Sequence, residues 1–418
     1  MSIKIKYRRS ALILFSFIAT IVGLCRCMDH AKKPATEADA PTLAPAPVFA
    51  DYTSSDKCVS CHKDIYDNYI HTAHSLTAAP ATEKYIKGSF KKGQNTYSYT
   101  PSILLSMEKR DSGFYQVVYF KGEEKKAMKF DIVIGSGVMG QSYLNWRGNR
   151  LYQLPITYFT AAGQWSNSPG FPHERVLIDR PVTSRCLECH ATYAQGTSGT
   201  ALEPVEFDRS KIILGVDCQK CHGPAAKHVE YQEQHPEDKT AKYIVNPAKL
   251  SRIQQLDVCA LCHSGNIQKT KPSFQFAAGQ ALSDYFITDT SGSAVLNGAN
   301  IDVHGNQYAL LRASKCFKMS TTLTCNTCHD THKNERGQLE LLSQRCMTCH
   351  DPAAAEFKTP THTSVATLQK NCIDCHMPAQ PSKSIAVFLQ GQETPKASSL
   401  RSHFIAIYPE EAKKFLNK

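Results

Sequence analysis

The most regular hydrophobic pattern of the chain lies between residues 96 and 159, where β-branched and aromatic residues form short runs. Turn residues separate these runs, notably Lys121-Gly122-Glu123 and Arg147-Gly148-Asn149, so the pattern predicts strands joined by tight turns. The runs cover residues 113–120, 127–134, 141–146 and 151–159. We therefore expect an antiparallel β-insertion over residues 96–165.

A second apolar segment lies at the N-terminus. Four basic residues occur among the first nine, and an apolar run follows over residues 11–24. This pattern predicts an export signal, because the run is too short for a confident transmembrane span. Residues 25–50 are rich in Ala, Pro and Thr and predict a flexible tether. Cys25 or Cys27 at its start favours a membrane-anchored lipoprotein, with a soluble periplasmic protein or an uncleaved anchor as alternatives.

Cysteine is the compositional outlier, with 17 copies in 418 residues. Fourteen of them form one pattern, Cys-x-x-Cys-His, which the chain repeats seven times. The copies are Cys58/Cys61/His62, Cys186/Cys189/His190, Cys218/Cys221/His222, Cys259/Cys262/His263, Cys325/Cys328/His329, Cys346/Cys349/His350 and Cys372/Cys375/His376. Below we number these motifs one to seven in chain order. The three cysteines outside them are Cys25, Cys27 and Cys316, and we expect Cys316 to be a small buried core residue.

The repeated motif is the attachment signature of haem c. Its two thiols add to the two vinyl groups of one porphyrin, and the adjacent imidazole becomes the proximal ligand of the iron. Zinc sites need no histidine directly after every second cysteine, and a thioredoxin-like dithiol occurs once rather than seven times. We therefore predict seven covalently attached haems, with the seven motif histidines as proximal ligands.

The second axial ligand separates an electron carrier from an enzyme. A second histidine saturates the iron, whereas a vacant or water-filled position can bind a substrate. The candidate distal ligands are His74, His173, His228, His304, His332, His362 and His403. His71 and His235 are weaker candidates, and His30 lies in the tether. We expect His332 to reach a neighbouring haem, because it follows His329 by one helical turn and cannot cross the same porphyrin.

Seven haems in a mature chain of this length leave too few residues for each haem to have its own domain. We therefore expect a mostly helical and irregular multihaem fold in which the porphyrins form much of the core. The predicted order is an export signal (1–24), a tether (25–50), a segment for the first haem (51–95), the β-insertion (96–165) and a six-haem domain (166–418). The β-insertion would shield the first haem or dock a partner.

The formal charge of +11 would ordinarily raise the question of nucleic-acid binding. Removal of residues 1–24 lowers it to +7, because this segment carries four basic and no acidic side chains. Two propionates per haem and one positive charge per ferric core bring the oxidised protein to about zero. We therefore exclude nucleic acid as a partner and expect redox proteins as donor and acceptor.

Several segments resemble a known group of cytochromes. The stretch from Cys58 to His62, followed by Tyr66, Tyr69 and His74, resembles the opening of multihaem cytochromes related to the tetrahaem cytochrome c-554. The third motif, followed by Gly-Pro, and the seventh, followed by Met-Pro, resemble later segments of this superfamily. Residues 314–332 are similar to a block of exported multihaem cytochromes.

This resemblance covers roughly residues 52–410. It implies electron transfer through closely packed haems, with distal ligands at His74, His228, His332, His362 and His403. Its members include both electron carriers and reductases of nitrogen or sulfur compounds. We therefore expect a heptahaem c-type cytochrome that carries electrons in the periplasm or at the cell envelope. The alternative is a reductase that acts on a small nitrogen or sulfur compound at one five-coordinate haem, with the haems at His62 and His263 as the candidates.

Overall fold

The structure is a computed structural model that describes residues 45–197, 204–265, 267–288, 305–351 and 370–416. The predicted export signal, Cys25, Cys27 and most of the predicted tether lie outside the described residues. Residues 46–418 form one compact unit. Within the described ranges, no helix is both long and apolar enough to cross a membrane.

The expectation of a mostly helical fold is wrong. Helix accounts for 28% and strand for 27% of the structure. Strands also occur where little sheet was expected, in the hairpins β12–β13 (Ala191–Gly196, Phe207–Leu214) and β16–β17 (Ala379–Val387, Lys396–Arg401) and in the short pair β14–β15 (Gln268–Lys269, Phe286–Ile287). In β12 the first four residues are buried, so β-branched and aromatic side chains there pack a core that sequence periodicity alone did not reveal.

A four-stranded antiparallel sheet is formed by β2 (Thr96–Thr100), β3 (Ile103–Arg110), β4 (Gly113–Phe120) and β5 (Glu123–Lys129). The β4–β5 hairpin pairs Phe120 with Glu123 across a two-residue turn. Both turn residues, Lys121 (φ 50°) and Gly122 (φ 83°), have positive φ. This is the type I′ geometry that matches the twist of the two strands.

The second sheet follows the order β1-β6-β7-β8-β11, and β9 and β10 branch from β7. Its strands are β1 (Ala78–Pro80), β6 (Ile132–Ile134), β7 (Gly140–Arg147), β8 (Arg150–Gln153), β9 (Ile156–Phe159), β10 (Gln164–Asn167) and β11 (Arg180–Pro181). The run at 151–159 forms two strands rather than one, separated at Leu154-Pro155. Proline lacks the N–H that a ladder needs, which explains the interruption.

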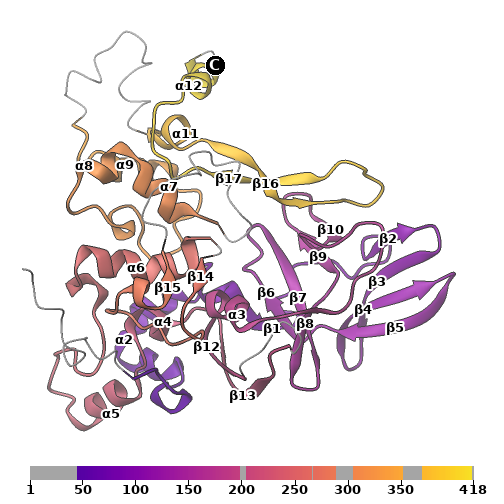
Figure 1. Cartoon of the computed structure of the whole chain (residues 1–418), viewed down its shortest axis with the longest axis horizontal. Coiled ribbons are helices and arrows are strands. Elements are labelled where there is room, and N and C mark those ends of the chain that lie inside the picture. The colour runs from indigo at the N-terminus through magenta and orange to yellow at the C-terminus, as the bar shows by residue number, and fades with distance from the viewer. Residues whose placement is uncertain (1–44, 198–203, 266, 289–304, 352–369, 417–418) are drawn as a thin grey trace, which may run out of the picture. The chain divides into compact units, whose positions relative to one another are not determined.

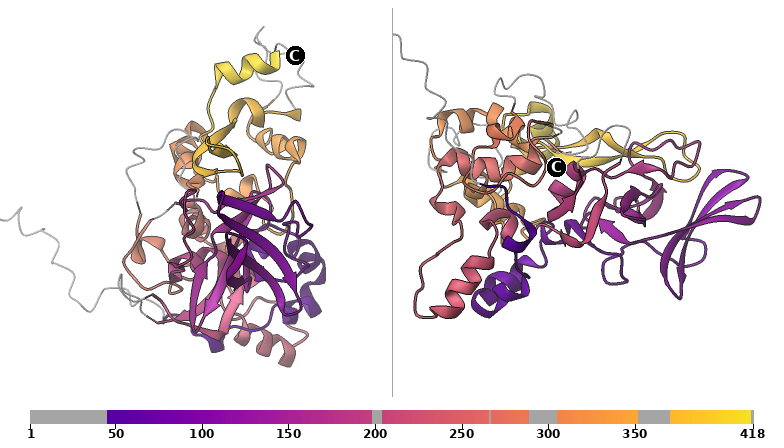
Figure 2. Two further views of the ribbon diagram at one scale, coloured as in Figure 1. Left: turned by 90° about the vertical axis from the view of Figure 1, so that its right-hand side faces the viewer. Right: turned by 60° about the horizontal axis from the view of Figure 1, so that its bottom comes forward.

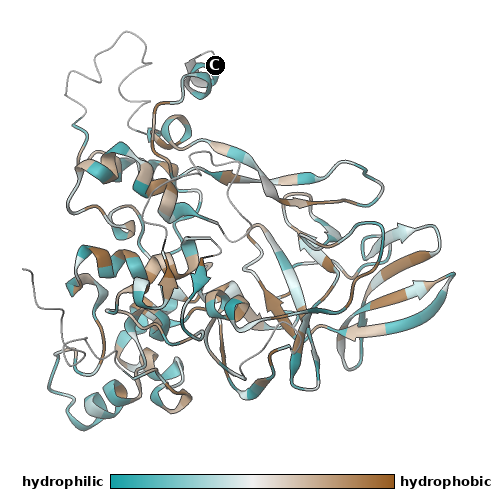
Figure 3. Cartoon of the chain, viewed as in Figure 1, coloured by the Kyte–Doolittle hydropathy of each residue, from teal (hydrophilic) through white to brown (hydrophobic). Residues whose placement is uncertain are grey.

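An aromatic core lies between these two sheets (Figures 1 and 3). Phe130 and Tyr143 stack with ring centroids 4.2 Å apart, and Trp165 packs 5.6 Å from Tyr143. The indole of Trp165 also lies against Gly88, where an added Cβ would come within 2.1 Å of the ring. The side chains of this core are closely packed, as in the interior of other globular proteins.

The Cys-x-x-Cys-His motifs lie on short helices and turns, which Figure 2 shows beside the sheets. The α-helices are α2 (Asp56–Tyr69), α3 (Ser184–His190), α4 (Cys218–His222), α5 (Ala226–Gln234), α6 (Arg252–His263), α7 (Gln307–Ala313), α8 (Lys315–Met319), α9 (Leu339–Cys346), α11 (Ile373–His376) and α12 (Pro409–Leu416). Single 3-10 turns are η2 (Phe49–Asp51), η3 (Ser75–Thr77), η4 (Pro247–Lys249), η5 (Leu282–Asp284) and η7 (Cys325–Thr327).

The C-terminal hairpin β16–β17 contacts the β-rich region. Leu389 forms a β-bridge with Ser166, and the N–H of Phe388 donates to Oδ1 of Asn167 at 2.7 Å. The Phe388 ring stacks on His173 with centroids 3.8 Å apart. The segment after the seventh motif is thereby fixed to the strands that precede the second motif.

Candidate haem-binding sites

Each motif is built on a helical turn, which explains its spacing. In the fifth, sixth and seventh motifs the histidine N–H donates to the carbonyl of the first cysteine, at 3.0, 2.9 and 3.0 Å. Helices α3, α4, α6 and α11 end at the motif histidine. Residues three and four apart lie on one face of a helix, so both thiols and the imidazole of a motif face the same side and can hold one porphyrin.

The first motif departs from this regular arrangement at Cys61. Cys61 is exposed, whereas Cys58 is half-buried. His62 has non-helical φ and ψ of −119° and 37°, and α2 is kinked directly after Cys61. Cys186 and Cys349 are exposed as well.

Two motif imidazoles are oriented by backbone carbonyls. Nδ1 of His222 lies 2.9 Å from the carbonyl oxygen of Val245, and Nδ1 of His376 lies 2.9 Å from that of Ala406. A carbonyl oxygen can only accept, so Nδ1–H donates in both cases and Nε2 is left as the metal-binding atom. Such contacts fix the tautomer and the orientation of a ligating histidine. Sequence reasoning missed Val245 and Ala406, because any residue supplies a carbonyl.

Three pairs of histidine rings face each other, and each pair combines a motif histidine with a candidate distal ligand. His332 lies 6.1 Å from His222, His74 lies 6.1 Å from His263, and His403 lies 6.2 Å from His329, measured between ring centroids. The members of each pair come from segments far apart in the sequence. His332 thus faces the third motif rather than its own, fifth motif.

These separations fit a metal ion between the rings. Two metal–nitrogen bonds of about 2 Å each, plus about 1 Å from each nitrogen to the centre of its ring, place two axial imidazoles about 6 Å apart. Rings in direct stacking contact lie closer, as His173 and Phe388 do at 3.8 Å. The three pairs therefore fit the axial positions of a haem iron, with the motif thiols available for the vinyl groups.

Burial keeps two of the candidate distal imidazoles neutral. Burial, followed by the nearby His263 and His329, lowers the pKa of His74 to about 4. Burial, followed by His329, lowers the pKa of His403 to about 4 as well. A metal-binding imidazole must be unprotonated, so both side chains are in the ligating form at neutral pH.

His228 lies near the first and third motifs. Its Nδ1 is 2.8 Å from the carbonyl oxygen of Lys242, the same arrangement that orients His222 and His376. The side chains of His62 and His228 both lie close enough to His222 to lower its pKa, after the larger effect of burial. Helix α5, which carries His228, is joined to α2 by an ion pair between Lys57 and Glu233 at 2.9 Å.

The other histidines are placed differently. His173 stacks on Phe388 and lies 3.8 Å from Glu174. Among the described residues, no ring contact joins it to a motif histidine. His71 is exposed, and His235 packs against Tyr231 at 4.5 Å. His30, His304 and His362 lie outside the described residues.

Cysteines of different motifs also meet, which the sequence did not predict. The thiols that lie close enough to shift each other's pKa are Cys58 and Cys218, Cys189 and Cys262, Cys259 and Cys325, and Cys346 and Cys372. Cys316 is half-buried rather than buried, and its thiol lies near Cys349. The motifs are therefore packed edge to edge.

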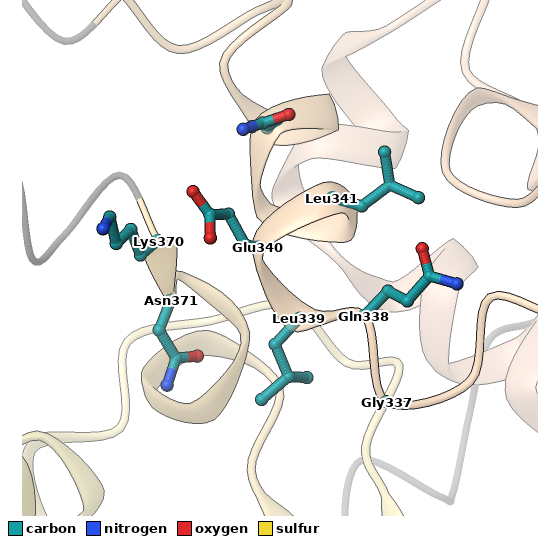
Figure 4. A pocket seen from close by; sticks show the side chains of 8 residues that line it. Gly337, Gln338, Leu339, Glu340, Leu341, Lys370 and Asn371 are labelled. Carbon is teal, nitrogen blue, oxygen red and sulfur yellow. The ribbon is translucent and has the colours of Figure 1, made fainter.

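A pocket of about 610 Å³ opens beside the sixth and seventh motifs (Figure 4). It is lined by the start of α9, from Gly337 to Leu341, and by Lys370 and Asn371, which directly precede Cys372. Glu340 comes from α9 and Lys370 from the segment before the seventh motif (Figure 4). The pocket is open and lined by both polar and apolar residues, as expected of a surface hollow rather than of a buried substrate site.

Comparisons with known proteins agree with this chemistry. Residues 172–223, which contain the second and third motifs, match the family described as cytochrome c554 and c-prime. The structure resembles the outer cell wall cytochrome OcwA with a TM-score of 0.50 and 16% sequence identity, over 88% of this chain and 82% of that one. No curated protein matches the sequence. Together with the motif geometry, these findings support a multihaem c-type cytochrome that binds haem c covalently and takes part in electron transfer.

Proposed function

We propose that the protein is a heptahaem electron carrier of the periplasm or cell envelope, whose irons are held between two histidines. The observation that carries this proposal is the spacing of 6.1, 6.1 and 6.2 Å in the three histidine pairs. The fourteen motif cysteines would hold the porphyrins, and His62, His190, His222, His263, His329, His350 and His376 would be the proximal ligands. Haem supplies one-electron chemistry, and the chain sets the ligands, the burial and the spacing.

The three histidine pairs support one axial pairing. His332 would serve the iron of the third motif, His74 that of the fourth, and His403 that of the fifth. His228 would serve the first motif, since α5 is joined to α2 beside it. Because His74 faces His263, the fourth haem is a poor candidate for the five-coordinate active site of a reductase, although no histidine follows this motif closely in the sequence.

A haem count tests the number of sites. We expect the intact mass of the purified holoprotein, together with its haem-to-protein ratio, to give seven haems per chain. The variant Cys372→Ser/Cys375→Ser should retain six haems, and the absorption bands of those six haems should be unchanged. Fewer than seven haems in the parent protein would refute the heptahaem assignment.

The carrier role has its own test. With every iron saturated, the reduced protein should not bind carbon monoxide. Binding at one haem in the parent protein would instead favour a reductase with a five-coordinate site.

The predicted lipid anchor at Cys25 or Cys27 and the redox partner proteins are further parts of this proposal. Mass spectrometry of the mature N-terminus and co-purification test these parts.

A further inference from the structure

The fourth motif occupies a special place in the network of cysteine contacts. Its two cysteines meet two different motifs, since Cys262 contacts Cys189 of the second motif and Cys259 contacts Cys325 of the fifth. The third, fifth and sixth motifs also lie near two others each. A thiol bonded to a vinyl group lies at the porphyrin edge, so each contact brings two porphyrin edges together.

The third motif is a further neighbour of the fourth. Cys221 lies close enough to Cys259 to act on its charge state. The backbone of His74, whose ring faces His263, accepts a hydrogen bond at 3.1 Å from the N–H of Val216, two residues before Cys218. The residue that faces the fourth motif histidine is therefore fixed to the third motif.

Helix α6 holds the fourth motif firmly in this position. Its Leu256, Ala260 and Leu261 are buried. The guanidinium of Arg185, on the helix of the second motif, donates to the carbonyl of Leu261 at 2.8 Å. Arg252, at the start of α6, donates to the carbonyl of Leu323 at 2.9 Å, two residues before Cys325.

The remaining cysteine pairs connect the other motifs to those around the fourth motif. Cys58 and Cys218 join the first motif to the third, and Cys346 and Cys372 join the sixth to the seventh. Between the fifth and sixth motifs, Cys328 lies near Cys349 and Cys346. The order of motifs in space thus differs from their order in the sequence.

We propose that the fourth motif, Cys259 to His263, is the branch point of the haem array. One arm holds the second motif, another the third and first, and another the fifth, sixth and seventh. This inference rests on the proposed function, because it requires a haem at each motif. Each transfer moves one electron from a ferrous to a ferric iron without making or breaking a bond, and redox partner proteins supply and remove the electrons. Because the array has three arms, one electron-donor protein at the end of one arm could supply two acceptor proteins at the ends of the others.

Haem-deletion variants test the branching directly. A ruthenium photoreductant is attached at Glu230→Cys, an exposed position on α5 beside the first motif, and repeated flashes inject electrons into the oxidised holoprotein. The readout is the number of haems reduced in the fast phase. In Cys259→Ser/Cys262→Ser we expect only two haems, those of the first and third motifs, to be reduced in the fast phase. In the matched control Cys186→Ser/Cys189→Ser, all six remaining haems should be reduced.

An array ordered as in the sequence gives the opposite result. Deletion of the second haem would then confine the electrons to one haem, and deletion of the fourth to three, which would overturn the proposal. If either variant fails to mature, anomalous scattering from crystals of the parent holoprotein locates the irons. The iron bound to His263 should have those of His190, His222 and His329 as its nearest neighbours, and any other set refutes the branch point. A haem count below seven would instead refute the proposed function.

Discussion

The β-rich region and the helices that carry the motifs bury their interiors in different ways. In the sheets, Leu105, Met107, Val117 and Tyr143 are fully buried and pack into a continuous apolar core. Helices α5 and α8 and turn η7 bury no residue, and the single buried residue of α4 is a glutamine. The sheets can therefore be stabilised by side-chain burial alone. In the motif region α6 buries Leu256, Ala260 and Leu261, but α4, α5, α8 and η7 contribute almost no apolar side chain to a core.

This difference shows what the cofactor contributes. The motif histidines His62, His263 and His329 are exposed, although burial lowers the pKa of His263 and His329. These exposed rings are accessible to a porphyrin. A bound porphyrin would supply apolar contacts that α4, α5, α8 and η7 lack, so that one region folds around side chains and the other would fold around its cofactor.

The largest expected effect follows from withholding haem. In a chain produced without haem attachment, α4, α5, α8 and η7 should lose nearly all protection against hydrogen exchange, because they bury almost no apolar side chain of their own. Strands β2 to β10 should remain protected. Hydrogen exchange measured by mass spectrometry on the haem-free and haem-loaded chains checks this prediction. Equal protection of the β-rich region and the motif region in the haem-free chain would contradict the proposed difference between them.

A core substitution in the sheets should have a smaller, local effect. Met107→Ala removes a fully buried side chain of β3 and should lower the free energy of unfolding of this region by about 2–5 kcal/mol. Phe120→Ala on β4, where the side chain is 41% exposed, is the control and should change it by about 0.5 kcal/mol or less. Denaturant unfolding followed by tryptophan fluorescence measures the free energy of unfolding of both variants. The haem absorption spectrum of each variant should stay native at low denaturant concentration.

Loss of a distal ligand should affect one haem. His332→Ala removes the imidazole 6.1 Å from His222, so the iron of the third motif should bind carbon monoxide in the reduced protein while the other six do not. His235→Ala is the control, because His235 packs against Tyr231 rather than against a motif histidine. A carbon monoxide difference spectrum that is unchanged in His332→Ala would refute the assigned pair.

The smallest effect is expected at the surface of the motif region. Lys57 and Glu233 join α2 to α5, but their side chains are 55% and 60% exposed. Exposed ion pairs contribute about 0–1 kcal/mol, so Lys57→Ala should shift the thermal midpoint slightly and leave the haem spectrum unchanged. A large loss would mean that surface charges, rather than haem packing, hold α5 in place.

Much of the local chemistry could be predicted from the sequence. The seven motifs are local patterns, since one helical turn brings Cys, Cys and His to one face. The run at 113–120 coincides with β4 because alternating packing and a Lys-Gly turn define it locally. The strands of the hairpin β16–β17 were missed, because its pairing depends on contacts with Asn167 and Ser166 far away in the chain.

The pairing of ligands could not be predicted in the same way. His74 and His263 are brought together by the packing of α6 and by the hydrogen bond from Val216 to the backbone of His74. Neither contact has a sequence signature. For His332, stereochemistry excluded its own motif, but the identity of its partner, His222, required the fold.

The central claim is that each haem iron lies between two histidines. The ferric electron paramagnetic resonance spectrum of the purified holoprotein, with its spins quantified against the haem content, tests this most directly. Our account predicts low-spin signals that account for all the haem. A high-spin signal equivalent to one haem or more would contradict it and identify an iron with an open coordination position.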